Sequence, residues 1–263
     1  MYSIISLKCV NGFVVTGSDP GKGIKLVKSE IKPRGILFDL WGTLVYNVPR
    51  YKREDYETIA RKIGRPTEEI WKTWASHSRD AILGNLTSGE ERARMVLKAL
   101  GGPPEVAADM VHYEAENLSG KVHFFEGVPA MLETLRQRGY RTCLISNCNY
   151  LTPGVVERLG LPEMLDEIIL SCQVKMAKPD KAIYELAAGR LGLPTGDCLF
   201  VGDGGDGELD GAKAAGCKVA LVAQERGHAY RFPQKVYPYD IRLNKVTDLL
   251  HFLPESAPKI PAA

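Results

Sequence analysis

The chain has 263 residues, of which 44% are hydrophobic and 25% charged, so disordered, collagen-like and coiled-coil chains are excluded. At roughly 150 residues per domain, this length predicts one large domain or a core with a smaller unit. The 34 Lys and Arg residues nearly balance the 32 Asp and Glu residues, so we expect no nucleic-acid partner and no membrane partner, and any anionic ligand must be bound at a local site.

The first 34 residues differ in composition from the rest of the chain. Residues 4–10 and 12–16 are short apolar segments around Asn11-Gly12, a dipeptide that favours a hairpin turn, so we predict that they pair. The segment 17–23 is one residue short of a P-loop and has no Ser or Thr after Lys22, and we interpret it as a loop. Residues 1–34 are therefore treated as an N-terminal extension of unknown role.

Strand and helix patterns alternate through most of the chain. Nearly unbroken apolar runs, typical of strands covered on both faces, occupy residues 35–39, 142–146, 198–203 and 218–222. Helical periodicity occupies residues 128–138, 153–159, 181–191 and 209–215. This alternation predicts an α/β fold, a Rossmann-like doubly wound parallel sheet formed by residues 35–46 and 125–253.

Residues 47–124 lack this strand pattern and read as an all-α cap. Four helices are predicted there, over residues 53–62, 68–83, 90–100 and 105–118. An insertion directly after the first strand should lie over the carboxyl ends of the strands, as a lid does. Residues 240–253 predict one more short strand and helix, and residues 254–263 form a tail.

The six cysteines are dispersed, without a C-x-x-C pair or a Cys/His cluster of zinc spacing. Several lie in apolar runs, which favours buried reduced thiols and a reducing compartment. The chain begins without a basic segment and a long apolar run, and no apolar stretch approaches the ~20 residues that span a bilayer. We therefore expect a cytoplasmic protein. The sequence does not indicate its oligomeric state.

Two acidic residues stand at the ends of predicted strands. Asp39 follows the first apolar run, and Asp203 ends the third, before a glycine-rich segment. Ligands of doubly wound sheets bind at the carboxyl ends of the strands, so we expect both carboxylates at one site. Neighbouring carboxylates repel each other unless a cation lies between them, and oxygen ligands favour Mg²⁺. The pattern therefore predicts a magnesium site.

Three further residues suit the handling of a phosphoryl group. Ser146 and Asn147 follow the second strand and offer a hydroxyl and an amide that can donate to phosphate oxygens. Lys178 follows a further predicted strand, residues 167–171, and its ammonium can neutralise an anionic site. A nucleophilic carboxylate, a metal, a lysine and small donors together indicate phosphoryl transfer.

The order of these motifs resembles that of the haloacid dehalogenase (HAD) superfamily. The motifs are Asp39-x-x-Gly-Thr43, Ser146-Asn147, Lys178-Pro179 and Gly202-Asp203 followed by Glu208. The resemblance covers residues 34–253 and implies that the helical insertion is the family's cap. It also implies that Asp39 attacks phosphorus to form an aspartyl-phosphate. Thr43 and Ser146 would then hold the phosphoryl group while Lys178 orients and neutralises it.

The resemblance also implies a ligand set for Mg²⁺. Asp39, the backbone carbonyl of Trp41 and Asp203 would hold the ion, with Glu208 acting through water. Asp206 is an alternative outer ligand, but spacing from Asp203 favours Glu208.

Trp41 departs from the phosphatases of the family, which carry a second aspartate two residues after the nucleophile as general acid and base. An indole cannot serve as that acid, whose help is typically worth ~10²–10⁴-fold. The substrate could then be an acyl or aryl phosphate that leaves easily. Alternatively, a residue such as His77, His112 or His123 supplies the proton, or turnover is slow.

Three functions remain open from the sequence. We predict a Mg²⁺-dependent phosphatase of a small phosphorylated metabolite. The 2-haloacid dehalogenases carry an aromatic residue where this chain has Trp41, and they need no metal, so a dehalogenase is the first alternative. The retained acidic loop around Asp203 favours the phosphatase. A weakly catalytic protein that binds a phosphorylated ligand is the second alternative.

Overall fold

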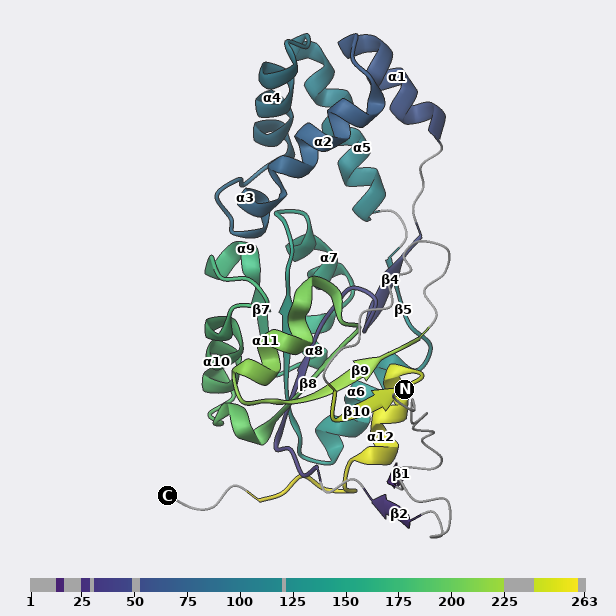
Figure 1. The fold of residues 1–263 in the computed structure, drawn as a ribbon, viewed down its shortest axis with the longest axis vertical. Helices are drawn as coiled ribbons and strands as arrows, with labels where there is room; N and C mark the ends of the chain where they lie inside the picture. The colour runs from purple at the N-terminus through teal and green to yellow at the C-terminus, as the bar shows by residue number, and fades with distance from the viewer. Residues whose placement is uncertain are drawn as a thin grey trace, which may run out of the picture.

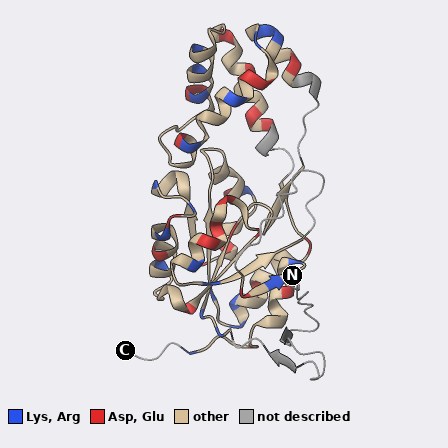
Figure 2. Ribbon diagram, viewed as in Figure 1, with Lys and Arg blue, Asp and Glu red and all other residues tan. Residues whose placement is uncertain are grey.

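The structure is a computed structural model that describes residues 13–16, 25–28, 31–48, 53–119, 122–224 and 239–259. Within these residues, no helix is both long and apolar enough to cross a membrane. Basic and acidic residues are interspersed along the described helices (Figure 2).

The N-terminal extension contains a pairing that the sequence did not predict. Strand β1 (Phe13–Thr16) pairs antiparallel with β2 (Lys25–Lys28), whereas residues 4–10, the predicted partner, lie outside the described residues. The predicted pairing with residues 4–10 therefore stays a prediction, while Leu26 and Val27 give the observed partner its strand propensity.

A six-stranded, all-parallel sheet forms the core and confirms the predicted α/β class. Its strand order is β10-β9-β8-β3-β6-β7. The strands are β3 (Gly35–Phe38), β6 (Arg141–Ser146), β7 (Glu167–Leu170), β8 (Cys198–Gly202), β9 (Lys218–Val222) and β10 (Ile241–Leu243). Strand β3 lies between β6 and β8, which places whatever follows β3 at the centre of the sheet edge.

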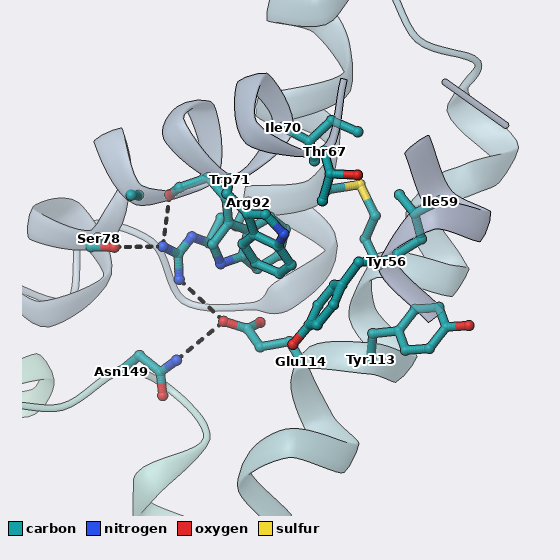
Figure 3. A pocket seen from close by; sticks show the side chains of 13 residues that line it. Tyr56, Ile59, Thr67, Ile70, Trp71, Ser78, Arg92, Tyr113, Glu114 and Asn149 are labelled. Atoms are coloured by element: carbon teal, nitrogen blue, oxygen red, sulfur yellow. Dashed lines mark hydrogen bonds and ion pairs between the residues drawn. The ribbon is translucent and has the colours of Figure 1, made fainter. Parts of the chain in front are cut away.

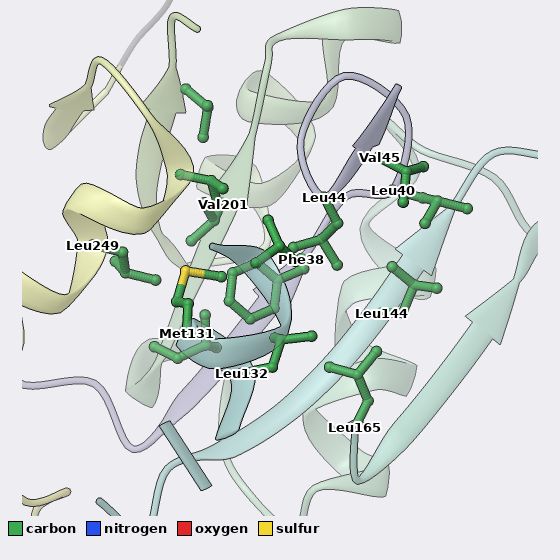
Figure 4. Packing of buried hydrophobic residues seen from close by; sticks show 14 of the residues in the cluster. Phe38, Leu40, Leu44, Val45, Met131, Leu132, Leu144, Leu165, Val201 and Leu249 are labelled. Carbon is green, nitrogen blue, oxygen red and sulfur yellow. The ribbon is translucent and has the colours of Figure 1, made fainter. Parts of the chain in front are cut away.

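Helices cover both faces of this sheet, and this explains the unbroken apolar runs. Alternate residues of β3 point to opposite faces: Ile36 and Phe38 pack in one hydrophobic cluster and Leu37 in another. The cluster around Phe38 is seen in Figure 4. It is covered by α6 (Val128–Gln137), α7 (Thr152–Arg158), α8 (Leu161–Met164) and α12 (Leu249–Phe252). The cluster around Leu37 is covered by α10 (Lys181–Arg190) and α11 (Glu208–Ala214).

The insertion after β3 stands as a separate group of helices above the sheet (Figure 1). Two short antiparallel strands, β4 (Val45–Asn47) and β5 (Val122–Phe124), lead into and out of it; the sequence did not predict them. Between them lie α1 (Arg53–Ile63), α2 (Thr67–Ser76), α3 (Ser78–Ile82), α4 (Gly89–Leu100) and α5 (Ala107–Ser119). We call this helical group the cap.

The single helix predicted over residues 68–83 is in fact two helices, α2 and α3. The break falls at His77, and the Ser76 hydroxyl donates to the carbonyl of Thr73, a local bond that competes with helix continuation. The carbonyl of Trp74 accepts from the side chain of Arg92, 2.8 Å away on α4. The periodic pattern was correct, but the break depends on a tertiary contact.

The cap contacts the core where α3 meets α9 (Ser171–Val174). The Ser171 hydroxyl donates to the carbonyl of Ile82 at 2.8 Å. Gly84, at φ 67°, approaches the backbone of Cys172 so closely that an added Cβ would clash with the Cys172 carbonyl oxygen. Only glycine permits this approach.

We therefore expect Gly84→Ala to weaken the docking of the cap. The matched control is Gly101→Ala, because Gly101 has a similar φ of 65° and open space around its Cα. Overpacking should make the free energy of unfolding of Gly84→Ala about 1–3 kcal/mol lower than that of the control, measured by urea denaturation. Equal losses in the two variants would contradict the close contact.

Candidate functional site

The site is built at the carboxyl edge of the three central strands. Asp39 directly follows β3, is 6% exposed, and its backbone N–H donates to the carbonyl of Val201 on β8 at 2.9 Å. Ser146 ends β6 on one side, and Asp203 follows β8 on the other. Gly42, at φ 79°, permits the tight turn that lets the chain leave the sheet directly after Asp39.

Lys178 bridges two buried carboxylates. Its Nζ lies 2.5 Å from Oδ1 of Asp39 and 2.6 Å from Oε2 of Glu208, and all three residues are buried. Burial by itself lowers the pKa of Lys178, but the charges of Asp39 and Glu208 outweigh it and raise the pKa above its ordinary value. The ammonium is thereby held in its charged form.

Glu208 is an acid of the site whose pKa is raised. Burial and the negative charge of Asp39 raise its pKa to about 8, although Lys178 and the backbone N–H of Gly204, 3.1 Å from Oε1, both oppose this rise. The side chain is therefore costly to keep ionised with Lys178 as its main positive partner. An additional cation would relieve that cost.

Three carboxylates converge as the sequence predicted for a metal site. Oxygen atoms of Asp39, Asp203 and Glu208 all lie within 4.8 Å of one another. With all three carboxylates ionised, one lysine would leave two negative charges for a cation to offset, and hard oxygen donors suit Mg²⁺, so these residues fit the ion. Asp206 lies outside this group and accepts from the Asn147 amide at 3.1 Å.

The phosphate-binding candidates divide into two kinds. The Thr43 hydroxyl donates to Oδ2 of Asp39 at 2.9 Å, and Thr43 and Ser146 are fully buried. The Asn147 amide, by contrast, accepts from the backbone N–H of Lys178 at 2.8 Å and donates to the Lys178 carbonyl at 2.9 Å. The Asn147 side chain therefore positions Lys178, and the expected role of Asn147 in binding phosphate stays a prediction.

Trp41 and the candidate histidines lie in apolar or aromatic surroundings. Trp41 forms a backbone bridge with Val45, and its side chain packs against the hydrophobic cluster around Phe38. His112 contacts the ring of Tyr113, His123 contacts the ring of Tyr46, and His77 forms the break between α2 and α3. The three histidines therefore belong to the cap and its connecting strands.

The sequence analysis missed a buried ion pair in the cap. Arg92 on α4 is 4% exposed, and its guanidinium lies 3.1 Å from Oε1 of Glu114 on α5 (Figure 3). Glu114 also accepts from the Asn149 amide at 3.3 Å and from the Tyr150 hydroxyl at 2.5 Å, both on the loop after β6. The sequence pattern could have indicated this pair, because Arg92 lies on the same face of α4 as the apolar residues Val96 and Leu100.

Comparison with known proteins identifies a family and similar sequences. A family model described as haloacid dehalogenase-like hydrolase matches residues 33–216. A phosphoglycolate phosphatase of Pectobacterium atrosepticum is 27% identical over 233 residues, 85% of this chain and 94% of that protein.

Two solved structures share the fold. One is a HAD phosphatase from Thermococcus onnurineus, with a TM-score of 0.54 and 20% identity over 82% of this chain and 95% of that chain. The other is a 2-haloacid dehalogenase from Pseudomonas syringae pv. Tomato DC3000, with a TM-score of 0.59 and 20% identity over 84% of this chain and 97% of that chain. The fold alone therefore does not separate the two activities.

The Lys178 bridge makes a stability prediction. Lys178→Met leaves two buried carboxylates without their shared cation, and should lower the free energy of unfolding by about 3–5 kcal/mol in metal-free buffer. The double variant with Glu208→Gln should recover part of the lost free energy of unfolding, because one of the two buried charges is then removed. Urea denaturation of the two variants measures both effects.

Lys213→Met is the matched control for this prediction. Lys213 lies 3.4 Å from Asp240, but its side chain is 41% exposed, so the loss should be below about 1 kcal/mol. If Lys178→Met lowered the free energy of unfolding no more than Lys213→Met does, Lys178 would not be needed to offset the buried carboxylates.

Proposed function

The chain belongs to the haloacid dehalogenase-like hydrolase family and is a hydrolase, and on that premise we propose that it is a cytoplasmic, Mg²⁺-dependent phosphatase of a small phosphorylated metabolite. The convergence of Asp39, Asp203 and Glu208 around one lysine carries this proposal, because an attack on carbon would need no such excess of negative charge. The similarity to a phosphoglycolate phosphatase supports it. The dispersed cysteines support the cytoplasmic location.

Asp39 is positioned to be the nucleophile. A carboxylate oxygen of Asp39 attacks phosphorus, the bond between phosphorus and the ester oxygen breaks, and the ester oxygen departs with the electron pair and then takes a proton from water to give the alcohol. Lys178 and the Thr43 hydroxyl orient the carboxylate, and the lysine and Ser146 offer positive charge and a donor to the phosphoryl oxygens. Water then hydrolyses the aspartyl-phosphate, releasing phosphate and restoring the carboxylate of Asp39.

The residues that would hold Mg²⁺ are Asp39, the backbone carbonyl of Trp41, Asp203 and Glu208. When bound, the ion would offset the negative charge of the phosphoryl group. Glu208 is held in place by the backbone N–H of Gly204, and Asp203 by that of Gly205 at 2.8 Å. The loop after β8 thus fixes both acids before any ion enters.

Trp41 restricts the substrates that the site can process. Its indole packs against apolar side chains where phosphatases of the family carry an acid. Because the residue at this position cannot donate a proton, the ester oxygen lacks the acid that other phosphatases of the family provide there, and it leaves more readily when it tolerates negative charge. Substrates with acidic leaving groups should therefore react faster than ordinary alkyl phosphates.

A dehalogenase is the second candidate, since Trp41 is the aromatic residue that this branch carries. In that reaction Asp39 would attack the carbon of a 2-haloacid and displace halide, without metal. Halide release from 2-chloropropionate in EDTA, abolished by Asp39→Asn, would establish it in place of the phosphatase.

The principal test is phosphate release from acetyl phosphate, p-nitrophenyl phosphate and sugar phosphates, with Mg²⁺ or with EDTA. We expect Mg²⁺-dependent release that Asp39→Asn abolishes, with a bias toward the first two compounds because their leaving groups are good. Binding of phosphate analogues without release of product would instead favour a phospho-ligand-binding protein.

The metal ligands are tested by comparing two neutral variants of neighbouring acids. Glu208→Gln should raise the Mg²⁺ concentration for half-maximal activity about 10–100-fold, because Glu208 belongs to the carboxylate group. Asp206→Asn is the control and should change this concentration less than about three-fold, since Asp206 contacts Asn147 instead. A larger effect at Asp206 would reverse the assignment.

A further inference from the structure

The cap contains a cavity of about 330 Å³ whose lining is mainly apolar and aromatic (Figure 3). This volume is at the lower end of the range for small-molecule sites, about 300–1,000 Å³. Its aromatic side chains come from α1, α2 and α5 and are Tyr56, Trp71, Trp74 and Tyr113. The rings of Tyr56 and Trp71 meet edge to face, with centroids 4.7 Å apart. Such rings bind another ring through offset or edge contacts.

The polar end of the cavity disfavours a second anionic group on the ligand. Arg92 is the cationic residue among the lining residues that the structure describes, and Glu114 neutralises it at 3.1 Å. The guanidinium also donates to the Trp74 carbonyl and to the Ser78 hydroxyl at 2.7 Å, and it stacks over the Trp74 ring. A carboxylate placed here would meet Glu114 without an uncompensated cation to bind it.

One residue that lines the cavity lies close in sequence to a residue of the sheet-edge site. Asn149, which lines the cavity and donates to Glu114, follows Ser146 by three residues. Three residues span at most about 10 Å between Cα atoms. This limit applies to the Asn149 end of the cavity, so a substrate with its phosphoryl group beside Asp39 would extend past Asn149 to place a ring in the cap.

Trp41 provides an independent constraint on the same substrate. Because Trp41 packs against apolar side chains and cannot supply a proton, a leaving oxygen that tolerates negative charge is favoured. A phenol, with a pKa near 10 as in tyrosine, meets this condition far better than an alkyl alcohol, which is about as weak an acid as water. Leaving-group chemistry and cavity lining thus point to the same class of compound.

We propose that the substrate is a phosphate monoester of a phenol, whose aromatic ring occupies the cavity between α1, α2 and α5; this rests on the proposed phosphatase function. The bond between phosphorus and the aryl oxygen breaks as Asp39 attacks, and the electron pair leaves on the phenolate. Water protonates the phenolate, and a second water hydrolyses the aspartyl-phosphate. The net reaction consumes one water and gives phenol and phosphate.

The experiment uses 2-naphthyl phosphate, with acetyl phosphate as a reactive substrate that has no ring. Trp71→Ala removes one wall of the cavity and should lower kcat/KM for 2-naphthyl phosphate about ten-fold, while acetyl phosphate changes less than about two-fold. Trp71 is 38% exposed, so the fold should tolerate the change. Met95→Ala, at a 40% exposed position of the cap outside the cavity lining, is the control and should alter neither substrate.

Binding of 2-naphthol separates the cavity from catalysis. Calorimetry should show 2-naphthol binding to Asp39→Asn, and about ten-fold weaker binding to Asp39→Asn with Trp71→Ala. The inference is overturned, with the phosphatase intact, if Trp71→Ala affects both phosphates equally or if 2-phosphoglycolate is the better substrate. Trp71-dependent binding of 2-naphthol without hydrolysis of any phosphate would overturn the phosphatase but support the ring site.

Discussion

The ammonium of Lys178, buried between Asp39 and Glu208, is the interaction on which the rest of the site depends. Three carboxylates at one sheet edge would repel each other strongly in the low dielectric of the interior. Lys178 offsets part of that charge, and Asn147 bonds both backbone groups of Lys178 and so fixes its position. The loops after β6, β7 and β8 are thereby joined into one unit, with a remaining negative charge that suits a divalent cation.

The molecule holds its charged cluster and its aromatic cavity in different parts of the fold. The sheet edge carries Asp39 and the other charged groups, whereas the aromatic cavity lies among the cap helices. Glu114 connects them, because it pairs with Arg92 inside the cap and accepts hydrogen bonds from Asn149 and Tyr150 on the loop after β6. Burial raises the pKa of Glu114, while Tyr150 and Arg92 oppose that rise. Its bonds therefore favour the docked position of the cap.

Trp41 contributes to packing at the turn after Asp39. Its indole packs against the hydrophobic cluster around Phe38, and its backbone forms a bridge with Val45 at the start of β4. The proposed preference for a good leaving group follows from this indole, and it agrees with the aromatic lining of the cap cavity on which the proposed substrate rests.

The sequence by itself determined the α/β class, because strands buried on both faces are apolar throughout. It also singled out Asp39, Ser146, Lys178, Asp203 and Glu208, because each belongs to a local motif that comes after such a strand. Only the tertiary structure decided the partner of β1, the β4–β5 pair, the break between α2 and α3, the Asn147 bonds to Lys178 and the Arg92–Glu114 pair. Each of these depends on groups well separated in the chain, such as Asn147 and Lys178, 31 residues apart. Local pattern carries no information about which distant side chain will satisfy a buried polar group, and packing settles that choice.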